Sequence, residues 1–83
     1  MIIFVYNSDE QRKQIEESVN TDSFIFYDDR KLKERKKGAT EMHKYGARKF
    51  PFAMIYDSEN NPIKGFWSEA NNVISDLIDY LNE

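Results

Sequence analysis

The sequence predicts a single α/β domain with a mixed four-stranded sheet and helices on both faces of that sheet. Three observations lead to this fold class. Residues 2–6 form an unbroken apolar run, which is typical of a central strand covered on both sides. Two segments with helical spacing of apolar residues follow, and each leads into a further strand. Turn-forming residues 58–62 then separate two short strands, so the element order is β-α-β-α-β-β-α over residues 1–83.

The first strand and helix should begin a β-α-β unit, whose two strands must be parallel. Ser8 and Gln11 match a capping box, and they predict a helix over about residues 9–19. The apolar stripe of this helix is thin, because it consists of Ile15 and Val19 alone. We therefore expect the helix to cover the sheet with little to spare.

The second strand is predicted over residues 23–27 and the second helix over about 29–45. Asp28-Asp29 should cap this helix, Gly46 should end it, and Gly38 should weaken its middle. Its apolar positions fit helical spacing and are expected to face the sheet: Leu32, Ala39, Met42 and Tyr45.

The third strand is predicted over residues 52–57, and it pairs through the hairpin with a strand over residues 63–67. At the end of that strand, we expect one ring of the pair Phe66 and Trp67 to face the core and the other the solvent side. Ser68 or Asn71 should cap the last helix. That helix has a clean amphipathic stripe: Val73, Ile74, Leu77, Ile78 and Leu81.

The composition excludes several classes of function. No cysteine is present, which rules out thiol redox chemistry and thiolate metal sites, and the single histidine, His43, cannot anchor an ordinary metal site alone. No apolar run reaches the length of a membrane span, and residues 1–6 are too short and lack the basic start of a signal peptide. We therefore expect a cytoplasmic protein without a cofactor or a metal.

The segment Gly46-Ala47-Arg48-Lys49-Phe50-Pro51, with the hairpin and last helix after it, resembles the second half of thioredoxin and glutaredoxin domains. The resemblance implies a thioredoxin-like fold with a cis bond before Pro51. It places the Cys-x-x-Cys motif of that superfamily on residues 7–11, which contain no cysteine. Trp67-Ser68-Glu69 also departs from the glutathione-binding pattern of glutaredoxins. Disulfide exchange is therefore excluded, and we do not expect an enzyme.

The resemblance further implies a groove beside this proline. The backbone of Phe50, just before a cis proline, would offer unpaired groups to an extended peptide. The candidate groove residues are Tyr6, Ser8, Phe50, Pro51 and Trp67. We therefore predict a redox-inactive module that binds a protein or peptide, or regulates one. Two alternatives stay open: Pro51 shapes only the junction, and Trp67 only covers the end of the last helix.

A second candidate surface comes from charge. Residues 30–49 carry nine basic and two acidic side chains, a net charge of +7, while the rest carries three basic and thirteen acidic ones, a net charge of −10. The basic residues of interest are Arg30, Lys31, Lys33, Arg35, Lys36 and Lys37. They suggest an accessory protein that binds a polyanion or nucleic acid, or a contact with an acidic protein surface. The alternative is a solvated helix face.

Other constellations are weaker. Tyr6 and Ser8 occupy positions where glutathione transferases, relatives of this fold, use a hydroxyl, but 83 residues cannot contain the additional helical domain of those enzymes. The acidic pairs Asp9-Glu10, Glu16-Glu17 and Asp28-Asp29 are explained by helix starts or exposed faces. The thinly covered first helix leaves room for homodimerisation through its outer face.

Overall fold

The computed structural model describes residues 1–67 and 72–83, and it confirms a mixed α/β fold in the predicted order of elements. The described part contains β1 (Ile2–Tyr6), α1 (Asp9–Ser18), β2 (Phe24–Asp28), α2 (Leu32–Lys44), β3 (Phe52–Tyr56), β4 (Pro62–Phe66) and α3 (Val73–Leu81). The sheet order is β2-β1-β3-β4. β1 is parallel to β2 and antiparallel to β3, and β3 is antiparallel to β4, so the predicted hairpin and parallel pair are both confirmed.

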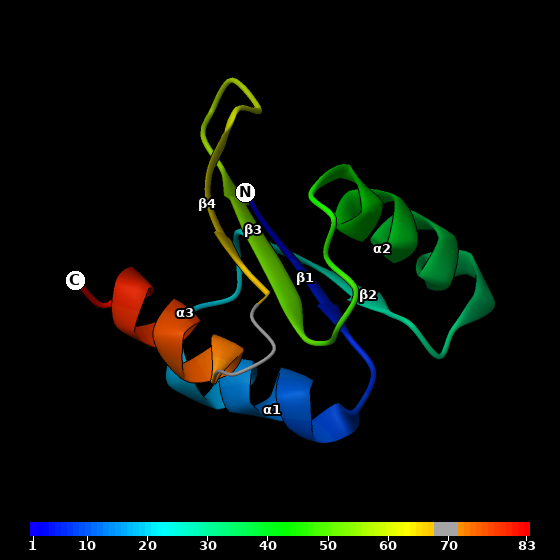
Figure 1. Ribbon diagram of the computed structural model, residues 1–83. Coiled ribbons are helices and arrows are strands. Elements are labelled where there is room, and N and C mark those ends of the chain that lie inside the picture. The colour runs from blue at the N-terminus through cyan, green and yellow to red at the C-terminus, as the bar shows by residue number, and fades with distance from the viewer. Residues whose placement is uncertain (68–71) are drawn as a thin grey trace.

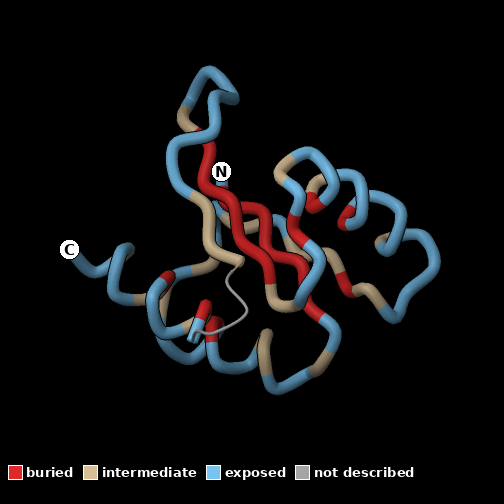
Figure 2. The backbone as a smooth tube through the Cα atoms, viewed as in Figure 1, coloured by how far each residue is buried: buried red, intermediate tan, exposed pale blue. Residues whose placement is uncertain are grey.

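The helices cover both faces of the sheet, as predicted (Figure 1). Side chains alternate along β1, so Phe4 points to the core beneath α1 and α3 while Val5 points to the core beneath α2. β1 and β3 are buried along their whole length, and Figure 2 shows them at the centre of the molecule. No helix in residues 1–67 or 72–83 is long and apolar enough to cross a membrane.

α1 starts as the capping box predicts. The Ser8 hydroxyl oxygen accepts a hydrogen bond from the Gln11 N–H at 3.4 Å, and the Gln11 side chain accepts one from the Asn7 N–H at 2.8 Å. Ile15 is completely buried. The Arg12 guanidinium lies 4.3 Å from the centre of the Phe26 ring, so this charged side chain adds cover where the apolar stripe is thin.

α2 differs from the prediction at its start and on its inner face. It begins at Leu32 rather than Asp29, and neither Asp28 nor Asp29 caps it. Leu32 is 79% exposed and Ala39 is also exposed, so their expected contact with the sheet is wrong. Gly38 lies there instead, and a Cβ atom added to it would stand 2.8 Å from Cγ1 of Val5. This glycine lets the helix approach the sheet closely.

A chain of hydroxyl groups joins α2 to β3. The hydroxyls of Tyr45 and Tyr56 lie 2.7 Å apart, and Tyr56 donates a hydrogen bond to the Glu41 carboxylate at 2.8 Å. Burial, reinforced by these partners, raises the pKa of Tyr56 well above its ordinary value. The network fixes the C-terminal half of α2, and Gly46, with a φ of +72°, ends the helix as predicted.

The second half of the sheet follows the prediction closely. The Phe50–Pro51 peptide bond is cis, and the Asp57 carboxylate accepts hydrogen bonds from two N–H groups of the hairpin turn. Phe66 packs on the side of α3 and Trp67 on the side of α2. The expectation that one of these rings faces solvent is wrong, because helices cover both faces of the sheet.

α3 presents the predicted stripe to the sheet. Val73 and Leu77 are buried, and the other three apolar residues are half-buried. Asn72 stands at the N-cap and makes no side-chain capping hydrogen bond. The predicted caps, Ser68 and Asn71, lie outside the described residues.

Candidate functional site

The five residues of the predicted groove do not line one common surface. Tyr6 is only 2% exposed and packs on the side of α1 and α3. Phe50 and Trp67 pack on the side of α2, where Trp67 stacks on Tyr45. The sheet therefore separates Tyr6 from Phe50 and Trp67. Ser8 serves as the cap of α1.

Pro51 lines a small hollow on the side of α1 and α3. The hollow measures about 210 Å³, and its other lining residues are Gln14 of α1 and residues 72–75 at the start of α3. A second hollow, of about 300 Å³, continues along the two helices and shares Gln14, Ile74 and Ser75 with the first. Pro51 thus borders a groove between α1 and α3 rather than one beneath Tyr6 and Trp67.

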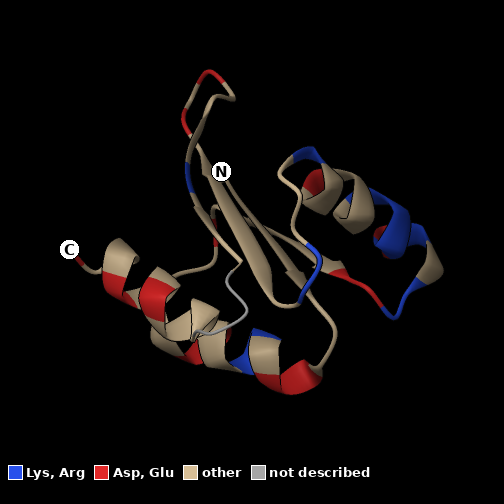
Figure 3. Ribbon diagram, viewed as in Figure 1, with Lys and Arg blue, Asp and Glu red and all other residues tan. Residues whose placement is uncertain are grey.

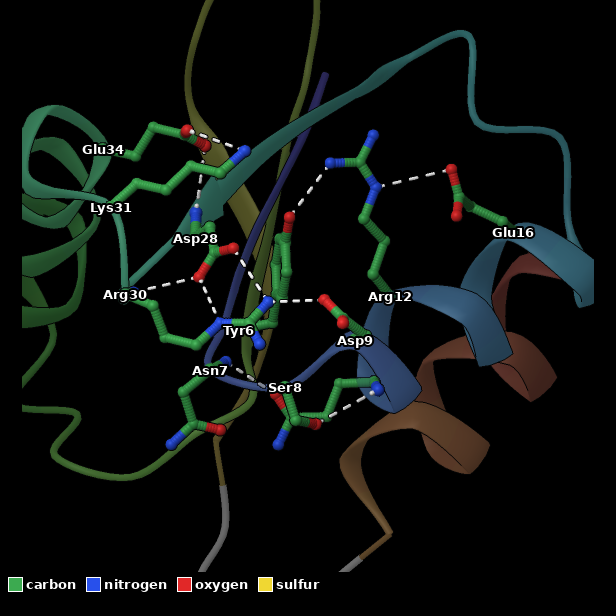
Figure 4. Close-up of polar contacts among 11 residues, drawn as sticks. Tyr6, Asn7, Ser8, Asp9, Arg12, Glu16, Asp28, Arg30, Lys31 and Glu34 are labelled. Carbon is green, nitrogen blue, oxygen red and sulfur yellow. Dashed lines mark hydrogen bonds and ion pairs between the residues drawn. The ribbon is translucent and has the colours of Figure 1, made fainter.

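The buried carboxylate of Asp28 organises the junction of β2 with α1 and α2 (Figure 4). The Arg30 side chain donates hydrogen bonds to both carboxylate oxygens of Asp28, at 3.0 and 2.9 Å. Arg30 also pairs with Asp9 at 2.6 Å. These contacts, above all the side-chain hydrogen bond from Arg30, hold the pKa of Asp28 below its ordinary value, against the opposing effect of burial.

This junction involves the start of α1, where the family resemblance would place a Cys-x-x-Cys motif. Asp9, in the first turn of the helix, is paired with Arg30, and Arg12 donates a hydrogen bond to the Tyr6 hydroxyl at 3.0 Å (Figure 4). Charge-paired side chains therefore occupy the region. Sequence reasoning missed the role of Asp28, because an aspartate just before a helix is usually a cap.

The basic residues divide into two groups. Arg30 pairs with Asp9 and Asp28, Lys31 lies 3.8 Å from Glu34, and Arg35 donates a hydrogen bond to the carbonyl oxygen of Asp29. The other group comprises Lys33, Lys36 and Lys37. These three are exposed, and no carboxylate of residues 1–67 or 72–83 forms an ion pair with them.

Exposed Leu32 accompanies the three unpaired lysines. We call the surface formed by Leu32, Lys33, Lys36 and Lys37 the outer face of α2. Lys33 follows Leu32 directly, and Lys36 lies one helical turn further along. A large exposed apolar side chain is therefore flanked by positive charge on the part of the helix that faces away from the sheet.

Charge is separated across the molecule, as the sequence suggests. Figure 3 shows Lys and Arg residues concentrated on α2 and the segments at its ends, whereas Asp and Glu residues are spread over α1, α3, the hairpin turn and the end of β2. α3 carries two acidic and no basic side chains, whereas α2 carries five basic and two acidic ones. The sheet lies between α2 and α3, so these two helices of opposite net charge make the domain an electrostatic dipole.

No protein-family model, curated protein or solved structure matches this chain. Its function is therefore inferred from geometry and charge.

Proposed function

We propose that this chain is a thioredoxin-like domain without thiol redox chemistry, and that it binds an acidic partner protein through the outer face of α2. The thioredoxin-like assignment is supported by the sheet order β2-β1-β3-β4 and by the position of Pro51 at the start of β3. The absence of cysteine removes the disulfide exchange of that superfamily, and the proposal is therefore a binding function rather than a redox one.

One observation carries the proposal, namely the group of three unpaired lysines beside an exposed leucine. Most other charges near α2 are neutralised within the molecule: Arg30, Lys31, Arg35 and Lys44 all contact carboxylates. Lys33, Lys36 and Lys37 are left available for a partner. An apolar contact at the centre with a polar rim around it is the general plan of a protein interface.

The alternative is a polyanion or nucleic acid as the partner. The same three lysines favour it, because clustered ammonium groups neutralise phosphates and release counterions. The exposed Leu32 favours a protein instead, since a phosphate backbone offers no apolar pocket for this side chain. The net charge of −3 also opposes non-specific binding to nucleic acid.

The test compares two charge reversals of equal size. Lys33→Glu/Lys36→Glu alters the outer face of α2, and Lys13→Glu/Lys64→Glu alters exposed lysines on α1 and β4. Immobilised wild type and both variants are incubated with lysate of the native host, and captured proteins are quantified by mass spectrometry. We expect an acidic protein to be lost at least tenfold with the first variant and retained with the second.

Two outcomes would contradict the proposal. One is equal capture by both variants. The other is that wild type binds a labelled single-stranded oligonucleotide. If that binding weakens steeply with salt and is lost with Lys33→Glu/Lys36→Glu, the polyanion is favoured as the partner. Circular dichroism of both variants provides the folding control.

A further inference from the structure

The groove between α1 and α3 has room for an aliphatic side chain such as Leu32, and its charged lining is opposite in sign to the lysines on the outer face of α2. The larger of its two hollows has a volume of about 300 Å³, which is near the lower limit for small-ligand pockets and sufficient for one aliphatic side chain. Its apolar lining comes from half-buried Ile74 and Ile78. The exposed carboxylates of Glu17 and Asp79 lie beside them, one from each helix.

We propose that the partner of the outer face of α2 is a second copy of this chain, with Leu32 of one copy inserted between α1 and α3 of the next. This inference rests on the proposed function, because it uses the same face of α2. In the contact, Lys33 and Lys36 of the first copy meet Glu17 and Asp79 of the second. Both surfaces consist of exposed or half-buried side chains, so neither needs to unfold.

Charge complementarity is the argument for a second copy over an unrelated acidic protein. α2 carries five basic and two acidic side chains, α3 carries two acidic and no basic ones, and the two helices lie on opposite sides of the sheet. Stacking two copies head to tail places opposite charges together, whereas placing like faces together is repulsive. Lys13 is the basic neighbour of Glu17, at 3.9 Å, and both of these side chains are largely exposed, so this weak pair does not block the approach.

The contact is heterologous, because the two surfaces that meet are different. A single molecule cannot satisfy its own groove, since α2 lies across the sheet from α1 and α3 (Figure 1). Each added copy leaves one free leucine and one free groove. Association therefore continues beyond the dimer as concentration rises, unless a ring closes.

The test uses two variants that each block one surface. Leu32→Asp removes the apolar side chain and brings a carboxylate toward Glu17 and Asp79. Ser75→Tyr fills the groove, because exposed Ser75 lines both of its hollows. Sedimentation velocity measures the mass of wild type, each variant and their equimolar mixture. We expect wild type to associate with concentration, each variant to be monomeric, and the mixture to form a dimer and nothing larger.

Three outcomes would overturn the inference: a wild type that is monomeric at all concentrations, a variant that still associates, or a mixture that contains only monomers. Circular dichroism confirms that each variant is folded before mixing. The result is separable from the test of the proposed function. A monomeric wild type that still captures an acidic host protein through Lys33 and Lys36 would refute self-association and leave the proposed function intact.

Discussion

At the scale of single residues, Asp28 is the side chain whose environment differs most from that of an exposed carboxylate. It is 3% exposed, and the Arg30 side chain contacts both of its oxygens while its carbonyl oxygen accepts a hydrogen bond from the Lys31 N–H. A buried charge is tolerated only when it is paired and hydrogen-bonded. Asp28 meets both conditions, and we therefore expect it to contribute to stability.

Asp28→Asn should lower the free energy of unfolding at pH 7 by about 1–3 kcal/mol, the usual cost of losing hydrogen bonds to a buried charged group. The pKa of Asp28 in the folded wild-type protein lies below the unfolded value of about 3.9. The stabilisation that the Asp28 carboxylate provides is thus fully present above the unfolded pKa, and it is lost as pH falls through the folded pKa. Urea unfolding from about pH 7 to about pH 2 should show the curves of wild type and variant converging in acid.

Asp22→Asn serves as the matched control, because Asp22 is exposed on the turn before β2. It should change stability by less than about 0.5 kcal/mol across the same range. The carboxylate of Asp28 would not have the stabilising role assigned to it in either of two cases. One is that Asp28→Asn changes the free energy of unfolding as little as the control does; the other is that its loss of stability stays constant down to the lowest pH.

At the scale of elements, α2 shows both the reach and the limit of pattern-based prediction. Its existence, its end at Gly46 and the inward position of Met42 follow from helical spacing. The prediction that Leu32 faces the sheet was wrong. Helical spacing assigns any apolar residue in register to the inner face, and it treats glycine only as a residue that weakens the helix. Gly38 is instead the point where helix and sheet touch, and only the positions of Val5 and Tyr27 in space reveal this.

Gly38→Ala tests this close packing of α2 on the sheet. Alanine raises helix propensity by about 1 kcal/mol, but its Cβ would lie 2.8 Å from Val5 Cγ1 and 3.3 Å from Tyr27 Cβ. Valine is stiff at χ1, and forcing extra volume into a packed core costs about 1–3 kcal/mol. We expect a net loss of about 1 kcal/mol in urea unfolding.

A double-mutant cycle isolates the contact between Gly38 and Val5. Val5→Ala alone should destabilise by creating a cavity, but in the Gly38→Ala background it also removes the clash. The two changes should therefore couple favourably by at least about 0.5 kcal/mol. Additive effects, or a stabilising Gly38→Ala, would indicate that room exists between helix and sheet.

The two candidate surfaces also differ in how far the sequence could predict them. The basic segment 30–49 is visible as a run of charges, but its division into paired and unpaired residues depends on carboxylates elsewhere, such as Asp9, which lies 21 positions before Arg30. The predicted groove failed to assemble, because alternation along β1 sends Tyr6 to the face opposite Trp67. The groove between α1 and α3 combines residues from both ends of the chain, and no local pattern marks it.

At the scale of the whole molecule, the edges of the sheet limit how copies can meet. The backbone N–H groups at both ends of the edge strand β2 already have acceptors within the molecule. The Phe24 N–H donates to the Thr21 carbonyl oxygen, and the Asp28 N–H donates to the Glu34 side chain. The other edge strand, β4, begins with Pro62, which lacks an N–H group, and Lys64 adds charge to it. Neither edge is a ready template for pairing with another strand.

Association of this protein should therefore occur through helical faces and depend strongly on salt. Raising the salt concentration from about 0.05 to about 0.5 M shortens the Debye length several-fold and screens the exposed charges of α2 and of the groove. We expect the association constant from sedimentation equilibrium to fall at least tenfold, because the charged groups meet at an exposed surface. The free energy of unfolding should change little, since exposed ion pairs contribute little to it.

Strand addition predicts the opposite behaviour, because backbone hydrogen bonds between edge strands do not depend on these charges. It would give association that is insensitive to salt, together with an intermolecular β-sheet band in the infrared amide I region. Glu34→Ala supplies the comparison within the same protein, because it frees the Asp28 N–H on the edge of β2. Strand addition and the contact between helical faces are separated if association is salt-resistant in this variant and salt-sensitive in wild type. Salt-resistant association of wild type would contradict the contact between the outer face of α2 and the groove.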